Sequence, residues 1–260
     1  MLEGARKLGI RVDYKRSLEY RGKPEHDAAI FYGFSDGLRR IFDDYRKTTR
    51  RAVYVDLGYW GRRKRTRHDG YHKIAINDRH PTAYFQLRKH PGDRFHQFDI
   101  PIRPWRKKSR HVLVAGMSAK AAAAEGFGAE EWERRAIARL RELTDRPIVY
   151  RPKPNWPHAS LIAGSALQRG VPIEEALNNC HAVVTHHSNV AVDGLLAGIP
   201  CICEAGVASV LGSRSLEDIE NPPMPDGREQ WAADLAYTQW NMDEMRAGRA
   251  WRYLLDEELI

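Results

Sequence analysis

The stretch that decides the fold covers residues 183–200 and reads VVTHHSNVAVDGLLAGIP. An apolar strand ends in a polar turn, a helix over residues 190–197 begins at once, and Gly198 is expected to end it in the left-handed conformation. A second apolar run, residues 200–203, follows directly. This order predicts parallel pairing of the two strands, with the helix starting at the carboxyl edge of the sheet, where open α/β folds bind ligands.

The rest of the chain repeats this alternation. Apolar runs predict further buried strands at residues 28–32, 52–56, 111–115, 147–150 and 182–185. Helical patterns at residues 37–45, 130–143 and 173–178 separate them. Strands that are apolar on both faces and alternate with helices predict a doubly wound α/β fold.

Two lobes are expected, because a polar stretch with prolines at residues 99–110 reads as a linker. The predicted lobes are residues 1–105 and 106–227, and residues 228–260 form C-terminal helices at 229–240 and 243–255. Trp240 and Trp251 on these helices need apolar surface, which predicts that the helices return to the first lobe. That lobe opens on a helical stretch at residues 1–8, so either its first strand is absent or the chain starts at an internal methionine.

The charge balance favours anionic partners. The chain has 42 Lys and Arg against 34 Asp and Glu, a formal net charge of +8. One dense basic block follows two aromatic residues, a pattern suited to a phosphate backbone and stacked bases, and a second block lies within residues 103–110. Either block also fits a solvated loop. The candidate acceptor-binding residues are Tyr59, Trp60, Arg62, Arg63 and Lys64.

Several protein classes are disfavoured by what the sequence lacks. The three cysteines, Cys180, Cys201 and Cys203, include no CxxC pair, which argues against a disulfide framework and fits a reducing cytosol. No signal peptide or apolar run of membrane-spanning length is recognised, so a cytoplasmic protein is expected. P-loop and GxGxxG patterns are absent, which disfavours kinases and nicotinamide enzymes.

No metal or cofactor is expected from the sequence. His186 and His187 are adjacent, and neighbouring residues of an extended segment face opposite ways, so they are not expected to share one ion. Ser188 and Asn189 open the helix at residue 190 and are suited to phosphate, although Ser188 also fits a plain N-cap. Arg151 and Lys153 follow a predicted strand, where cations can contact a diphosphate.

Four segments resemble GT-B glycosyltransferases, especially the capsule-polysaccharide type that includes Kdo transferases. SNVAVDGLLAGIPCI (188–202) resembles their donor-site helix, and RPIVYRPKP (146–154) resembles a motif in which His usually stands where this chain has Lys153. HVLVAGMSAK (111–120) resembles the opening of the second lobe, and AVYVDLGYWGRR (52–63) resembles a strand and turn of the first. The overall pattern also resembles phage-encoded members of this group.

The resemblance implies two Rossmann-like lobes, a C-terminal helix that crosses back to the first lobe, and a nucleotide-sugar donor bound by the second lobe. The donor-site residues that it implies are Ser118, Arg151, Lys153, His187, Ser188, Asn189 and Glu204. Of these, Glu204 follows a strand, where a carboxylate often binds a ribose hydroxyl.

An inverting transfer needs a base for the acceptor hydroxyl. Asp56 at the end of a strand is the first candidate and Asp78 the second. The predicted function is therefore sugar transfer from a nucleotide sugar, either to a modified base of phage DNA in the host cytoplasm or to a surface polysaccharide. A nucleotide-sugar epimerase and a non-catalytic nucleic-acid-binding relative are the alternatives, and the oligomeric state stays open.

Overall fold

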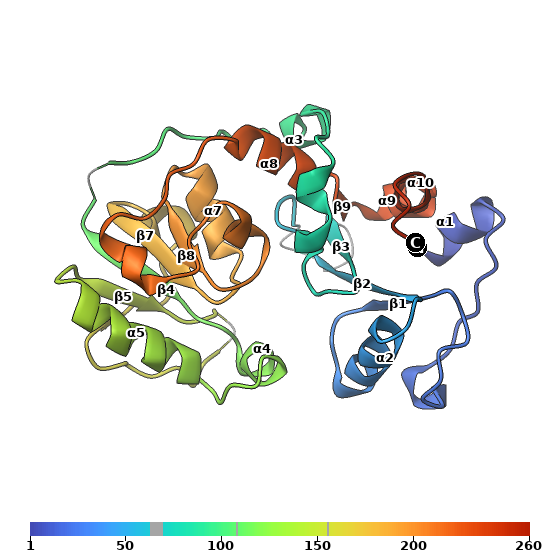
Figure 1. Cartoon of the computed structure of the whole chain (residues 1–260), viewed down its shortest axis with the longest axis horizontal. Coiled ribbons are helices and arrows are strands. Elements are labelled where there is room, and N and C mark those ends of the chain that lie inside the picture. The colour runs from blue at the N-terminus through green and yellow to red at the C-terminus, as the bar shows by residue number, and fades with distance from the viewer. Residues whose placement is uncertain (63–69, 108, 155) are drawn as a thin grey trace. The chain divides into compact units, whose positions relative to one another are not determined.

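The structure is a computed structural model that describes residues 1–62, 70–107, 109–154 and 156–260 (Figure 1). The chain forms two compact units. Unit 1 comprises residues 1–98 and 233–260, and unit 2 comprises residues 99–232. Each unit has its own sheet. No helix within the described residues is long and apolar enough to cross a membrane.

Unit 2 contains a parallel sheet with the strand order β6-β5-β4-β7-β8. Four of these strands lie where the sequence predicts them, and the short β6 was not predicted. Their bounds are β4 His111–Ala115, β5 Ile148–Arg151, β6 Ala166–Leu167, β7 Cys180–Thr185 and β8 Cys201–Cys203. The central strands are buried on both faces because α5 (Glu131–Leu143) covers one face and α7 (Val190–Leu196) the other (Figure 1). The prediction of a parallel α/β unit is confirmed here.

The core of unit 2 follows from this layering. On one side α5 buries Ile137 and Leu140 against Val112 and Val184. On the other side Gly194 of α7 lies so close to β7 that a Cβ would stand 3.0 Å from a methyl group of Val183. Shorter elements complete the unit: α4 Ala119–Ala124, α6 Ile173–Ala176, and the 3-10 helices η4 Val207–Val210 and η5 Leu216–Glu220.

Within the stretch expected to link two lobes, residues 103–106 pack onto the end of α7. Gly198 ends this helix with a φ of 77°, as predicted. A Cβ there would lie 2.0 Å from the carbonyl oxygen of Pro104, so the segment can approach only a glycine. The backbone N–H of Arg106 donates to the carbonyl of Gly198 at 2.8 Å. The segment is therefore part of unit 2.

Unit 1 has a mixed sheet with the order β1-β2-β3-β9, so the expected doubly wound parallel sheet is wrong for this unit. Strands β1 (Ala28–Tyr32) and β2 (Arg51–Leu57) are parallel and joined by α2 (Asp36–Arg46). The next strand, β3 (His72–Ile76), is antiparallel to β2. The antiparallel pairing continues past the end of β2, where the N–H of Gly58 donates to the carbonyl of Tyr71 at 2.9 Å.

The aromatic core of unit 1 lies between this sheet and α2. It contains Phe31, Phe42, Tyr45 and Tyr54. The remaining short elements are α1 Leu2–Lys7, η1 Ser17–Glu19, η2 Pro81–Ala83, η3 Phe85–Leu87 and α3 Asp93–His96. The helical opening that the sequence predicts is present as α1. Within the described residues, no strand precedes β1.

The C-terminal residues are part of unit 1. Helix α8 (Arg228–Ala236) spans the division between the units, and the predicted helix over residues 229–240 ends early because β9 (Gln239–Trp240) pairs with β3. The single helix expected over residues 243–255 is two helices, α9 (Met242–Arg246) and α10 (Arg249–Asp256). They separate at Gly248, which has a φ of 81°. The indole N–H of buried Trp251 donates to the carbonyl of Met1 at 2.9 Å.

Candidate functional site

Strand register in unit 2 places the predicted donor residues along one edge of the sheet. Arg151 pairs with Ala115, Ala115 with Thr185, and Thr185 with Cys203. The residues that follow these four therefore leave the sheet side by side at its carboxyl edge. With neighbouring strands about 4.8 Å apart, Arg151 and Thr185 lie about 10 Å apart. This edge is the candidate functional site.

The centre of the edge holds two histidines in contact. The rings of His186 and His187 are perpendicular, their centroids are 5.0 Å apart, and their Nδ1 atoms are 2.8 Å apart. The expectation that these side chains face opposite ways is wrong, because β7 ends at Thr185 and the histidines lie in the bend that follows.

Two carboxylates flank this pair. Glu125 Oε1 lies 3.7 Å from His187 Nδ1, and Glu204 Oε2 lies 3.6 Å from His186 Nε2. Glu204 was a predicted donor-site residue, and it is half exposed. Glu125 was not predicted. It follows α4, far from the histidines in the sequence, and only the packing of that helix brings it here.

Aromatic side chains fix His186. Phe127 and Trp132 contact its ring edge-on, with centroids 5.7 and 6.0 Å away. The indole N–H of Trp132 donates to Glu204 Oε1 at 2.6 Å, so the proposed ribose-binding carboxylate already has one protein partner. The backbone N–H of Ala205 donates to the carbonyl of His186 at 2.8 Å. Together these contacts hold the imidazole in one orientation.

The two serines predicted for the donor site support the local backbone. Ser188 is buried, and its hydroxyl accepts from the N–H of Val190 at 3.4 Å. Ser118 is the N-cap of α4 and accepts from the N–H of Ala121 at 3.2 Å. Asn189 precedes α7 and makes no side-chain capping bond. The N-cap position of α7 is therefore occupied by Asn189 and not by Ser188, whose hydroxyl bonds to the first residue of the helix.

A cationic cavity of about 370 Å³ opens beside the end of β5. Arg151, Lys153 and Arg169 line it, together with Trp156 and Gln168. The guanidinium of Arg169 donates to the carbonyls of Pro157 and Ala159. Ser188 and Asn189 do not line this cavity. Arg151 ends β5, whereas these two residues follow β7, so they are at different places along the same sheet edge.

A buried glutamate supports the turn between β4 and α4. Glu133 Oε1 accepts the N–H of Met117 at 2.5 Å, and Glu133 Oε2 makes no hydrogen bond to the described residues. Burial raises the pKa of this carboxyl above its usual value, and the hydrogen bond from Met117 opposes that rise. The sequence carried a signal for it, since Glu133 lies directly beside Trp132 on the apolar face of a predicted helix.

The base candidates lie in unit 1. Asp56, in β2, accepts the hydroxyl of Tyr54 at 2.7 Å on one oxygen and the N–H of Leu57 at 2.8 Å on the other. Asp78 is exposed in a turn and accepts the N–H of Arg79 at 2.6 Å. Both carboxylates therefore have local partners, and Asp56 is the less exposed of the two.

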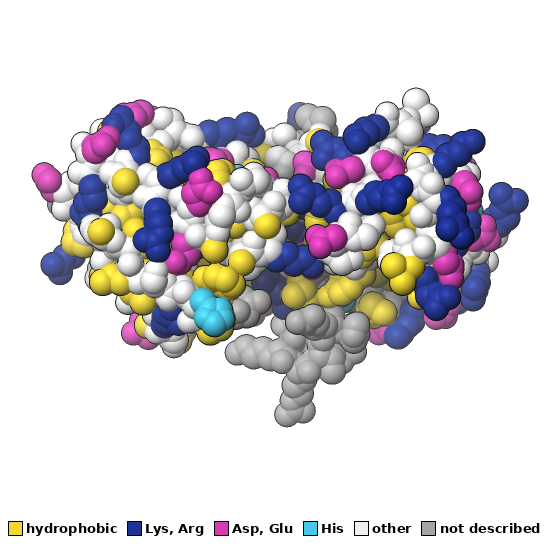
Figure 2. All heavy atoms as spheres, turned by 90° about the horizontal axis from the view of Figure 1, so that it is seen from below, with side chains coloured by type: hydrophobic (Ala, Val, Ile, Leu, Met, Phe, Trp, Pro, Cys, Tyr) yellow, Lys and Arg dark blue, Asp and Glu magenta, His cyan; other side chains and the backbone are white. Residues whose placement is uncertain are grey.

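The predicted nucleic-acid contacts need correction. Tyr59 and Trp60 are each 4% exposed, and both backbone N–H groups donate to Gln239 Oε1, so neither ring is free to stack on a base. Arg62 is exposed and donates to the carbonyl of Tyr59 at 3.1 Å, while Arg63 and Lys64 lie outside the described residues. Figure 2 shows Lys and Arg mixed with Asp and Glu over the visible face.

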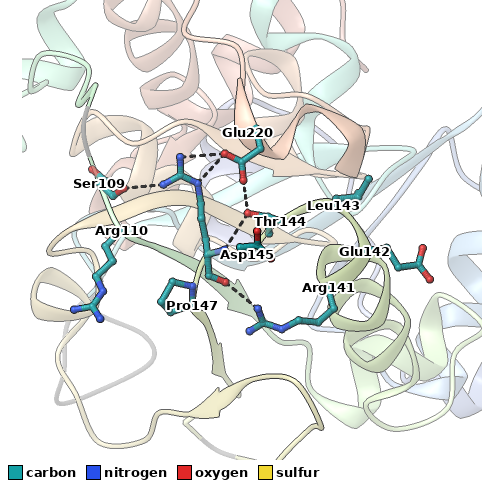
Figure 3. A pocket seen from close by; sticks show the side chains of 10 residues that line it. Ser109, Arg110, Arg141, Glu142, Leu143, Thr144, Asp145, Pro147 and Glu220 are labelled. Atoms are coloured by element: carbon teal, nitrogen blue, oxygen red, sulfur yellow. Dashed lines mark hydrogen bonds and ion pairs between the residues drawn. The ribbon is translucent and has the colours of Figure 1, made fainter.

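A larger hollow of about 760 Å³ lies at the opposite, amino edge of the unit 2 sheet (Figure 3). Its charged groups bond to one another. The Arg146 guanidinium donates to the carbonyl of Ser109 at 2.9 Å and pairs with Glu220, and Glu220 also accepts the hydroxyl of Thr144. These bonds connect the loop before β5 to η5, so the hollow is best explained as part of the scaffold.

No protein-family model and no curated protein sequence matches this chain. Its fold is similar to solved structures of KpsC from Thermosulfurimonas dismutans. The one described as a beta Kdo 2,7 transferase is 13% identical with a TM-score of 0.57, over 99% of this chain and 95% of that one. The one described as a beta Kdo 2,4 transferase is 13% identical with a TM-score of 0.56, over 90% and 85%. At this identity the similarity shows the fold alone.

Proposed function

We propose that this protein is a glycosyltransferase of the GT-B type that binds a nucleotide-sugar donor at the carboxyl edge of unit 2. The observation that carries the proposal is the cavity beside β5, where Arg151, Lys153 and Arg169 gather at a ligand-binding edge. Guanidinium groups match phosphate oxygens in a forked geometry, and Trp156 adds a flat apolar wall. The fold similarity to two transferases supports the same reading.

The proposed reaction depends mainly on stabilising the negative charge of the leaving phosphate, and it needs no covalent intermediate with the protein. The bond between the anomeric carbon and the phosphate oxygen breaks, and its electron pair leaves with the nucleotide. An acceptor oxygen bonds to that carbon and loses its proton to a base. Fixed cations stabilise the charge that develops on the departing phosphate, which assigns that role to Arg151 and Lys153. We propose Asp56 as the base, with Asp78 as the second choice. The nucleotide sugar is a substrate, and the reaction needs no redox cofactor.

The acceptor is proposed to be an anionic polymer, because the formal net charge is +8. A modified base in phage DNA and an acidic surface polysaccharide both meet this condition. Labelled donor incubated with each polymer distinguishes them by which one becomes labelled. Changing Arg62, Arg63 and Lys64 to Ala weakens DNA binding at every sequence and flattens its salt dependence if DNA is the acceptor. An unchanged salt dependence would assign these residues to ordinary surface charge.

A thermal-shift screen against UDP, CMP, GDP and their sugars tests the donor. A ligand at about 100 times its dissociation constant adds about 2.7 kcal/mol to the stability of the unit that binds it. Stabilisation by one nucleotide family, together with transfer to an acceptor, is the expected result. Turnover of the sugar nucleotide without any acceptor would indicate an epimerase instead. DNA binding with no response to any nucleotide would indicate a non-catalytic nucleic-acid-binding protein.

A further inference from the structure

We propose that Glu125, His186 and His187 of unit 2 bind one divalent metal ion of the zinc type. The three residues each offer one ligand atom, and all three atoms lie within 4.8 Å of one another. Imidazole nitrogen and carboxylate oxygen together suit zinc and its first-row neighbours. The proposal concerns metal binding and does not depend on the proposed sugar transfer.

The distances between the donor atoms fit a shared ion. Zinc bonds to nitrogen and oxygen at about 2.0–2.2 Å, so two ligand atoms on a tetrahedral ion lie about 3.4 Å apart. The Nδ1 atoms of His186 and His187 are 2.8 Å apart, and Glu125 Oε1 is 3.7 Å from His187 Nδ1. These two separations bracket the required value, and the third, between His186 and Glu125, is at most 4.8 Å, so small side-chain shifts complete the triangle.

The tautomers that the surroundings favour also point to a cation. An ionised carboxylate only accepts hydrogen bonds, so Glu204, 3.6 Å from His186 Nε2, favours a proton on that nitrogen. With that tautomer the Nδ1 atom of His186 is an acceptor that can bind a metal ion, and it lies 2.8 Å from His187 Nδ1. A carboxylate that faces the other ring nitrogen of a histidine is the usual outer partner of a metal-bound imidazole. Trp132 holds Glu204 in that place with a 2.6 Å hydrogen bond.

The ligands are held before any ion binds. The ring of His186 lies against Phe127 and Trp132, and its carbonyl accepts the N–H of Ala205. His187 is held by the loop after β8. A Cβ built on Gly206 of this loop would stand 3.3 Å from the Cβ of His187, so the loop backbone packs directly against His187. Pre-positioned side chains lose little entropy on binding, which favours a specific site.

Three protein ligands leave at least one coordination position for water or for an oxygen of a bound ligand. The side chains of His187 and Glu125 are 16% and 21% exposed, so an ion can reach them from solvent. The open position therefore suits a phosphate oxygen as well as water. Closed structural zinc sites have four protein ligands, and this one, with three, is of the open kind.

The test uses the full-length chain, freed of metal with a chelator and titrated with Zn²⁺ by calorimetry and with Co²⁺ by visible absorption. We expect one equivalent per chain and intense Co²⁺ bands typical of low coordination number. His187→Ala and Glu125→Gln should each weaken binding by roughly 100-fold or more, because even outer-shell losses cost about 10–100-fold. The matched controls are His158→Ala and Glu174→Gln, both exposed residues of unit 2, which should bind as the wild type does.

Binding that is absent in the wild type, or that survives both ligand substitutions unchanged, would overturn the proposal. The wild-type protein also gives an answer if the variants fail to fold. Zn²⁺ should shift the side-chain ¹⁵N resonances of His186 and His187 by coordination at Nδ1. If only other histidines shift, the ion binds elsewhere and the proposal fails. None of these readouts requires a sugar donor, so they stand whatever the outcome of the transfer assays.

Discussion

The carboxylate of Glu133 lies buried against the backbone of Met117, whose N–H it accepts at 2.5 Å. This contact joins the first turn of α5 to the turn that follows β4, at the edge where we place the donor. A charged group in such a position destabilises the fold, and burial raises the pKa of Glu133 above its usual value of 4.5.

The first prediction is a pH dependence of stability. The folded state holds the Glu133 proton more tightly than the unfolded state does. Below pH 4.5 the carboxyl group is protonated in both states, so its burial as a charge does not lower the free energy of unfolding there. The free energy of unfolding should fall as the pH rises from there to the raised pKa, at about 1.4 kcal/mol per pH unit. Glu133→Gln should abolish this part of the pH dependence and be the more stable protein at pH 7. Urea titrations of both proteins from pH 4 to pH 8 measure it, and parallel curves would contradict the prediction.

The second prediction concerns the cationic cavity. Arg151→Ala removes a charged donor, and hydrogen bonds to charged groups contribute about 1.5–3 kcal/mol. The dissociation constant of the nucleotide found in the screen should therefore rise by roughly 10- to 100-fold. Arg110→Ala makes the same change of charge at the exposed amino edge of the same unit and is the control. Equal effects of both substitutions would mean that long-range charge, rather than this cavity, binds the nucleotide.

The third prediction concerns the base. Asp56→Asn preserves the shape of the side chain and its acceptor for the N–H of Leu57, but removes the negative charge. General-base catalysis contributes about 10²- to 10⁴-fold, so transfer should fall by that factor while nucleotide affinity stays the same. Single-turnover kinetics with saturating donor measure the step directly. Transfer near the wild-type rate, with Asp78→Asn inactive instead, would move the role to Asp78.

The fourth prediction concerns the C-terminal helices of unit 1. Trp251 is 5% exposed, and its indole donates to the carbonyl of Met1. Trp251→Ala should destabilise unit 1 by about 3–5 kcal/mol, the usual cost of truncating a buried aromatic side chain. Hydrogen exchange should show the loss in β3, β9 and α10. The neighbouring Arg252→Ala, at an exposed position, should leave exchange unchanged. Equal protection in both variants would mean that α10 contributes little to unit 1.

Local pattern was sufficient to predict most of unit 2. Short apolar runs bounded by helical patterns identified β4, β5, β7 and β8. Gly198 marked the end of α7, because only glycine adopts its φ at little cost. Unit 1 was predicted less well. The strand β3 reads His-Lys-Ile-Ala-Ile, too polar at its start to be recognised as buried, and β9 has only two residues.

The candidate site, too, was predictable from the sequence only in part. The sequence by itself determined that polar residues follow strands whose carboxyl ends share one edge, because the direction of a parallel strand fixes where its exit lies. Only the tertiary structure decided which of these residues meet. It turned His186 toward His187, brought Glu125 in from the end of α4, and buried Tyr59 and Trp60. It also placed strand β4 between Arg151 and the strand that leads to Ser188. Side-chain direction in a bend and contacts between distant segments depend on packing, which no local pattern of residues encodes.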